Sequence, residues 1–226
     1  FNTVVGNKLT VYKTLSNYPS IREHLPETRR FLHAEELIYM LKKYNSVYIK
    51  PAGGCMGQGI IRLQLEGNYY VSKGSSERKS SIYGSIHQVI HKYQLNGPRL
   101  ILIQQAIECP GGIGHFDIRV LVQKDGRGQW RVTGSACRVG SSGYVTSNLH
   151  TGGRPFPPGF VLSKVGFSEN DSKKIQQSLE ELALKIAELL DKDKKYLGDL
   201  GMDFILDESG NIWFLEVNSK PGRHSF

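Results

Sequence analysis

Three residues near the C-terminal end have the types and the spacing to bind a metal ion. Asp203 lies in an apolar, β-rich run, and Glu216 and Asn218 lie two positions apart in the next such run. Alternate residues of a strand face the same side, so Glu216 and Asn218 point together. Residues 207–211 have turn composition, and a hairpin there would bring Asp203 across from both. Two carboxylates and an amide oxygen on one face suit Mg²⁺, whereas the alternative is a hairpin whose polar residues only face solvent.

A glycine-rich loop in the first quarter of the chain offers a second candidate site. Residues 46–50 predict a strand, residues 60–65 predict a returning strand, and the loop between them contains Gly57 and Gly59. Its backbone N–H groups could lie over phosphates because glycine has no Cβ to block the approach. Lys50, at the end of the first strand, would reach under the loop. The loop lacks the GK[ST] sequence and the following helix of a P-loop, so a purely structural loop is the alternative.

The remaining elements must position these two sites. Helical periodicity predicts four helices, at residues 7–18, 33–44, 82–93 and 168–191. Apolar, β-rich runs predict further strands at residues 99–107, 116–123 and 129–139. Residues 72–81 are polar and predict a loop.

Two local features refine this interpretation. Ser168, with Asp171 three residues later, is typical of a helix N-cap. His87 and His91 have the spacing of a helical metal pair, but no HExxH glutamate accompanies them, so we expect surface histidines.

Composition limits the classes of function. The chain has 226 residues, a net charge of +8, and no apolar run of membrane-spanning length. Its basic residues are dispersed and form no aromatic-interleaved run, so we expect a nucleotide or other anionic ligand and no nucleic acid. The three cysteines lack CxxC spacing and fit a reducing compartment. Because the chain starts at Phe1 and shows no signal peptide, we expect it to be a fragment, a processed product or an ordered part of a longer protein.

Taken in order, the motifs resemble those of the ATP-grasp superfamily. Over the whole chain the resemblance is to the endospore coat-associated ATP-grasp family, and in the second half also to the ribosomal-protein α-L-glutamate ligases. The motifs that carry it are Lys50 with the GQG of residues 57–59, QQAI at 104–107, DIR at 117–119, SNLHTGG at 147–153, and D-x12-E-x-N from Asp203 to Asn218.

This resemblance implies an α+β, ATP-grasp fold of two α/β lobes with the nucleotide bound between antiparallel sheets. The smaller lobe would comprise residues 1–104, with the glycine-rich flap and the N-terminal helices. The larger lobe would comprise residues 105–226, with the metal-binding hairpin.

The resemblance also implies a role for each matching residue. ATP would be bound by Lys8, Lys50, Gly57, Gly59, Gln105, Ala106, Ile107 and Asp117. Two Mg²⁺ ions would be held by Asp203, Glu216 and Asn218. Charge developing on the transferred phosphoryl group would be stabilised by Arg119, Arg138 and Asn148. For Lys8 a structural role remains open, and Arg119 and Arg138 could instead pair with strand carboxylates.

The implied activity is ATP- and Mg²⁺-dependent ligation of a carboxylate to an amine through an acyl phosphate. That reaction needs no protein nucleophile, and the sequence shows no Ser-His-Asp or Cys-His arrangement. The substrates would include a peptide or protein, in a cytoplasmic protein associated with the spore. Two alternatives remain: an ATP-grasp kinase that phosphorylates a hydroxyl group, and a nucleotide-binding structural or assembly protein of the spore coat.

Overall fold

The computed structural model describes residues 5–54, 58–141, 153–193 and 196–222, and these form two compact units. The small unit comprises residues 26–106, and the large unit comprises the described residues before 26 and after 106. The second border, after residue 106, lies near the expected division after residue 104, whereas the border after residue 25 was not expected. The N-terminal helices, expected in the smaller lobe, instead belong to the large unit, because Val11, Leu15 and Ile21 are buried in its core.

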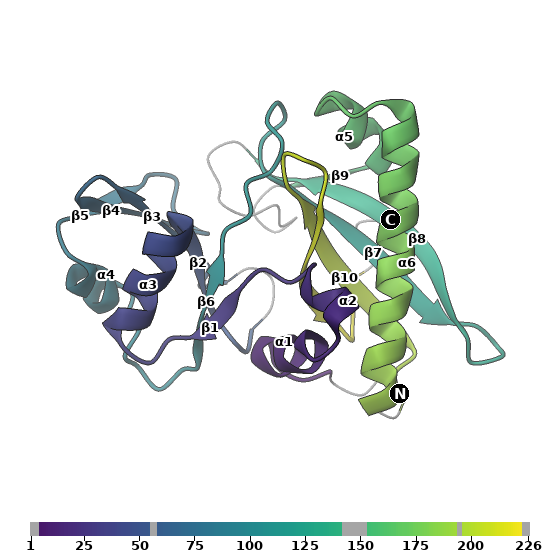
Figure 1. The fold of residues 1–226 in the computed structure, drawn as a ribbon, viewed down its shortest axis with the longest axis horizontal. Helices are drawn as coiled ribbons and strands as arrows, with labels where there is room; N and C mark the ends of the chain where they lie inside the picture. Colours follow the sequence, from purple (N-terminus) through teal and green to yellow (C-terminus); the bar gives the residue numbers. More distant parts are fainter. Residues whose placement is uncertain (1–4, 55–57, 142–152, 194–195, 223–226) are drawn as a thin grey trace. The chain divides into compact units, whose positions relative to one another are not determined.

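The small unit is a six-stranded antiparallel sheet with strand order β1-β6-β2-β3-β4-β5. The strands are β1 (Thr28–Arg30), β2 (Ser46–Pro51), β3 (Ile61–Glu66), β4 (Tyr69–Gly74), β5 (Ser81–Tyr83) and β6 (Ile101–Gln105). Helices α3 (Ala34–Tyr44) and α4 (Ile86–Lys92) pack on the sheet, as Figure 1 shows. Apolar side chains of both helices and of the central strands form one core, and Lys50, which follows the core residue Ile49 on β2, lies on the opposite face of the sheet.

The segment from residue 72 to residue 93 differs from the prediction. Strand β4 continues to Gly74 within the predicted loop, and Ile82 lies in strand β5, paired with Val71. The predicted helix at 82–93 begins only at Ile86. The reason is local, because Ser85 and Gln88 form a capping box that starts the helix after the strand.

The large unit contains a five-stranded antiparallel sheet with strand order β11-β10-β7-β8-β9. The strands are β7 (Phe116–Lys124), β8 (Trp130–Val139), β9 (Arg154–Phe156), β10 (Asp199–Leu206) and β11 (Ile212–Asn218). The helices are α1 (Lys8–Ser16), α2 (Pro19–Arg22), α5 (Pro158–Lys164) and α6 (Glu169–Asp193). Helix α6 runs along β7, β8 and β10 (Figure 1).

Helix α6 confirms the predicted amphipathic helix. The Ser168 hydroxyl accepts a hydrogen bond from the backbone N–H of Asp171 at 3.1 Å, which is the predicted N-cap. Leu179, Leu182 and Ile186 are buried against the sheet. This burial keeps the face of the sheet that α6 covers apolar, so the polar residues of the site must lie on the opposite face.

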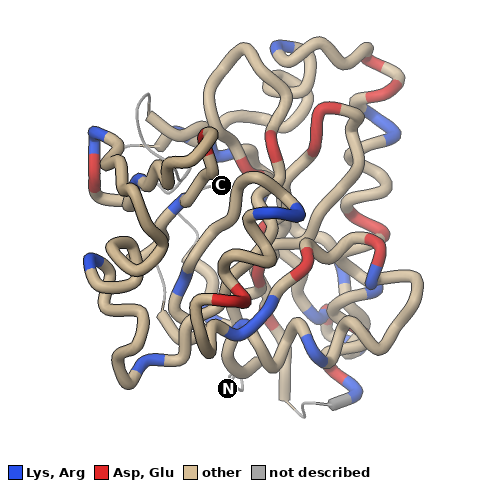
Figure 2. Tube along the Cα trace, turned by 60° about the vertical axis from the view of Figure 1, so that its left-hand side comes forward, with Lys and Arg blue, Asp and Glu red and all other residues tan. Residues whose placement is uncertain are grey.

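Charged residues are dispersed along the trace, as expected, and basic residues form no continuous stripe in Figure 2. The small unit nevertheless holds most of the chain's excess positive charge. Residues 26–106 contain 11 Lys and Arg and 5 Asp and Glu, a net +6 of the chain's +8.

A cluster of hydrogen bonds around the partly buried Glu27 joins the start of β1 to the end of α3 in the small unit. The Glu27 carboxylate accepts hydrogen bonds from Arg29 at 2.7 Å, from Lys43 at 2.7 Å and from the Tyr44 hydroxyl at 2.6 Å. Partial burial by itself would raise the pKa of Glu27, but these hydrogen bonds outweigh it and lower the pKa from 4.5 to about 2.

We expect Glu27 to make the stability of the small unit depend on pH. Because its pKa is lower in the folded chain, its contribution is present above pH 4.5 and is lost as the pH falls towards about 2. Urea unfolding between pH 5 and pH 2.5 should therefore show a smaller loss of stability for Glu27→Gln than for the wild-type chain. The matched control is Glu35→Gln, an exposed carboxylate on α3, and an equal pH dependence for wild type and Glu27→Gln would contradict the expectation.

Candidate functional site

The predicted hairpin is present, and it brings the three candidate metal ligands together. Strands β10 and β11 pair so that Asp203 lies opposite Glu216 and Gly201 lies opposite Asn218. The Asn218 side-chain amide lies 3.4 Å from a Glu216 carboxylate oxygen, so these two side chains share one face, as predicted. A register shift directly after Asp203 separates this polar end of the hairpin from its apolar end.

Gly201 allows the chain after Asn218 to fold back over the hairpin. A Cβ built on Gly201 would lie 2.6 Å from the Cβ of Pro221, which is closer than two carbon atoms approach. A residue with a side chain at this position would push Pro221 outward. Gly201 within β10 and Pro221 after β11 therefore fit together as one feature of the site.

Asp203 is the centre of a buried charge network. Arg119, its neighbour on β7, donates to both carboxylate oxygens, at 2.6 and 2.7 Å. Arg138 on β8 contacts Asp203 at 2.9 Å and also forms a two-pronged ion pair with Asp117. All four side chains are buried, and Asp203 is only 3% exposed. Two guanidinium groups and two carboxylates balance in charge, which is how such a cluster can be buried.

The network favours the charged forms of Asp203 and of the two arginines, whereas burial raises the pKa of Asp117. Burial alone would raise the pKa of Asp203, but the adjacent Arg138 and Arg119 hold that pKa below its ordinary value. Burial would lower the pKa of each arginine, but Asp203 outweighs it and the pKa of both is raised. The structure therefore shows the alternative that the sequence had left open, in which Arg119 and Arg138 pair with strand carboxylates. Their expected action on phosphate would require at least one of them to change partner.

Lys8 lies at the start of α1 and meets the same hairpin. Its ammonium group lies 3.2 Å from the Glu216 carboxylate, and the two side chains are 19% and 27% exposed. The preceding Asn7 caps the helix by accepting a hydrogen bond from the Thr10 backbone at 2.9 Å. The local fold thus places Lys8 beside a predicted metal ligand, within the same unit.

In the small unit, Lys50 is held by a chain of buried hydrogen bonds. Its ammonium group donates to the Gln104 side-chain oxygen at 2.7 Å, and the Gln104 amide donates to the Thr28 hydroxyl at 2.8 Å. The Thr28 hydroxyl donates in turn to the Pro26 carbonyl at 2.9 Å. Lys50 is only 6% exposed. Sequence reasoning missed Gln104 and Thr28 as partners, since only the register of β1, β6 and β2 brings them to Lys50.

The segment expected to contact adenine is tied into the small sheet. The Gln105 backbone N–H donates to the Glu27 carbonyl at 2.9 Å, and the Ala106 N–H donates to the Ser46 carbonyl at 3.2 Å. A purine contact from these two residues would therefore use their carbonyl groups. Ile107 follows directly and is buried.

Other predicted residues are only partly described. Gly57 and Asn148 lie outside the described residues. Strands β2 and β3 pair as an antiparallel hairpin, as predicted for the glycine-rich loop, and Gly59 has φ of +70°. That backbone conformation favours glycine. His87 and His91 are exposed, and no cluster of three or more His, Cys, Asp or Glu side chains suited to a metal occurs among the described residues.

Comparison with known proteins decides the family. Residues 1–226 match the YheC/D like ATP-grasp family. The chain belongs to this family. It is 29% identical over 232 residues to the endospore coat-associated protein YheD of Bacillus subtilis (strain 168), a match that covers 100% of this chain and 50% of that protein. The chain thus spans about half the length of this curated relative.

Solved structures confirm the α+β, ATP-grasp fold. N5-carboxyaminoimidazole synthase from Aspergillus clavatus, solved in complex with ADP, matches with a TM-score of 0.59 at 14% identity, over 97% of this chain and 45% of that chain. D-alanyl-alanine synthetase A from Vibrio cholerae O1 biovar eltor str. N16961 matches with a TM-score of 0.56 at 15% identity, over 94% and 54% of the two chains. At this level of identity the likeness concerns the fold. None of the described helices of this chain could cross a membrane.

The charge network generates a prediction about stability. Asp203→Asn would leave Arg119 and Arg138 buried beside a single carboxylate, so we expect a loss of about 3–5 kcal/mol in the free energy of unfolding. Glu216→Gln is the matched control, because its side chain is 27% exposed and its ion pair with Lys8 is worth about 1 kcal/mol or less. Urea unfolding of both variants is the measurement. Equal, small effects would contradict the central role of Asp203.

Proposed function

We propose that this chain forms the ATP-grasp part of an Mg²⁺- and ATP-dependent ligase that joins a carboxylate to an amine. The observation that carries the proposal is the cluster on the large sheet, where Asp203 and Glu216 are cross-strand partners, Asn218 adjoins Glu216, and two arginines converge on Asp203. Membership of an ATP-grasp family and a fold shared with two synthetases support the same chemistry.

The donor set fits the proposed cofactor. Two carboxylates and an amide oxygen are hard ligands of the kind that Mg²⁺ takes alongside substrate phosphates. Mg²⁺ bound there would neutralise phosphate charge as it is transferred. Asp203 and Glu216 already have cationic partners, namely Arg119, Arg138 and Lys8. These side chains can therefore exchange partners, with the carboxylates turning to the metal and the cations to phosphate oxygens.

The chain's own residues would divide the remaining tasks. Lys8, Lys50, Gly57 and Gly59 would contact the phosphates, and Gln105, Ala106 and Ile107 would bracket adenine. Asp117 would fix Arg138, its ion-pair partner. Arg119, Arg138 and Asn148 would stabilise the charge that grows on the transferred phosphoryl group.

The reaction would proceed in two displacements. A substrate carboxylate oxygen attacks the γ-phosphorus of ATP and releases ADP, which leaves an acyl phosphate. The amine nitrogen then attacks the acyl carbon, inorganic phosphate leaves with the C–O bond electrons, and the nitrogen loses a proton. No side chain of the protein forms a covalent bond to substrate in either step. The residues act by positioning and by charge, which suits a site built of ion pairs.

The names of relatives favour a spore setting. YheD is an endospore coat-associated protein, so we infer that this chain acts on, or within, a peptide or protein of the spore coat. The same observation favours a second candidate, a nucleotide-binding assembly protein that does not ligate. In that case ATP would bind without turnover.

Calorimetric titration with the non-hydrolysable analogue AMP-PNP, with and without Mg²⁺, tests the nucleotide site. We expect Mg²⁺-dependent binding that Glu216→Ala weakens by at least about tenfold, since the variant removes one of three metal ligands. Glu208→Ala, at the exposed turn of the same hairpin, should bind like the wild-type chain. Binding of equal affinity without Mg²⁺, or in Glu216→Ala, would overturn the metal assignment.

Product analysis separates the candidate activities. Incubation with Mg²⁺-ATP and mixtures of amino acids and peptides should yield an amide together with ADP and free phosphate if the chain is a ligase. A phosphorylated hydroxyl compound would identify a kinase instead. Mg²⁺-dependent nucleotide binding with no ADP release by the full-length protein would favour the assembly role.

A further inference from the structure

A separate feature of the small unit lies at the end of its sheet, on strand β5. Among the described strands, β5 is the last in the order β1-β6-β2-β3-β4-β5 and pairs only with β4. A hollow of about 540 Å³ lies beside it, lined by Ile82 and Tyr83 of β5 and by His87, Gln88, His91 and Lys92 on or near one side of α4. An edge strand next to a helix is the arrangement in which an extended peptide can add as a further strand.

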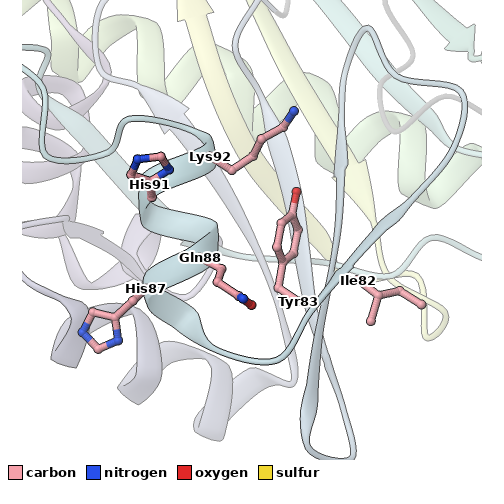
Figure 3. Close-up of a pocket in the computed structure, with 6 residues that line it drawn as sticks. All are labelled: Ile82, Tyr83, His87, Gln88, His91 and Lys92. Carbon is pink, nitrogen blue, oxygen red and sulfur yellow. The ribbon is translucent and has the colours of Figure 1, made fainter.

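The side chains of β5 present two different surfaces to such a peptide. Figure 3 shows the Tyr83 ring beside Gln88 and Lys92 of α4, whereas Ile82 points away from the helix. Ile82 is 68% exposed, and Tyr69 on the adjacent strand β4 is 58% exposed. Tyr69 and Val71 share a face, and Val71 pairs with Ile82, so the two exposed apolar side chains lie on the same face. This face would take apolar side chains.

The helix side of the hollow carries a positive charge, because Lys92 of α4 lines it. Residues 78–92 contain no Asp or Glu. The nearest carboxylate in the sequence, Glu77, accepts hydrogen bonds from the Gly74 backbone at 2.8 Å and from the hydroxyl of Tyr93, the residue after α4, at 3.3 Å, so it already has partners. The charge beside the hollow therefore favours acidic side chains.

We propose that the edge of β5 and the hollow beside α4 form a docking site for an extended acidic peptide in which acidic and apolar residues alternate. Because successive side chains of a strand face opposite sides, an added strand would direct its acidic residues towards Lys92 and its apolar residues towards Ile82. Backbone hydrogen bonds to the edge of β5 that is unpaired among the described strands would supply affinity without depending on peptide sequence. The site lies within the small unit and does not rely on the proposed ligase activity.

A competing explanation is that the edge is only protected against aggregation. Short edge strands flanked by lysines are a common device for that purpose. It does not account for the exposed Ile82 and Tyr69, which a protected edge would avoid. The two explanations differ in whether a strand-forming acidic peptide binds.

Fluorescence anisotropy tests the proposal with a fluorescein-labelled probe of four Glu-Val repeats and the full 226-residue chain at physiological salt. We expect saturable binding, at least about tenfold weaker for Ile82→Glu and about fivefold weaker for Lys92→Glu. Leu32→Glu, an exposed apolar position after β1, and Lys42→Glu, an exposed lysine on α3, are matched controls that should bind normally.

A modified probe tests whether the peptide adds as a strand. N-methylation of alternate residues removes one edge of backbone donors, so one of the two possible patterns should abolish binding and the other should not. No binding of the parent probe up to 1 mM, about equal binding of a Lys-Val probe, or equal loss with Lys42→Glu would each overturn the proposal. Normal Mg²⁺-AMP-PNP titrations of the Ile82 and Lys92 variants would show that any lost peptide binding does not come from the nucleotide site.

Discussion

The large unit depends on one physical constraint, which is that four charged side chains are buried together on one sheet. Asp117, Arg119, Arg138 and Asp203 come from three adjacent strands, and each has an oppositely charged partner at hydrogen-bond distance. An unpaired charge at this depth would be strongly unfavourable. The pairing of β7 with β8 and β10 must therefore hold its register, because a shift by one residue would turn these side chains to the apolar face.

The same constraint prepares the site for exchange of partners. Asp203 and Glu216 are the carboxylates expected to bind a cation, and protein cations occupy both of them in this state. A bound divalent ion would replace guanidinium and ammonium groups as the partner of the carboxylates. The released groups would then lie next to the phosphates that accompany the ion. Binding of metal and nucleotide would in this way be linked through charge balance, without a large change in the number of buried charges.

Much of the site could be predicted from the sequence because it depends on local rules. The turn at residues 207–211, and the alternation of side chains between the two faces of β11, predicted that Asp203, Glu216 and Asn218 lie close together. The structure confirms that the hairpin brings these three residues together. The support of Lys50 by Gln104 and Thr28 could not be predicted, since it depends on strands that are distant in sequence. The helix expected from Ile82 was wrong at its start, because periodicity does not reveal that a short strand and a capping box precede Ile86.

The central claim is that Asp203 exchanges its arginine partners for metal when nucleotide binds. A crystal structure of this chain with Mg²⁺ and AMP-PNP tests it most directly. The account predicts Mg²⁺ in contact with Asp203, Glu216 and Asn218, with at least one of Arg119 and Arg138 turned to a phosphate oxygen. Bound nucleotide with both arginines still paired to Asp203, and no metal on that carboxylate, would contradict it.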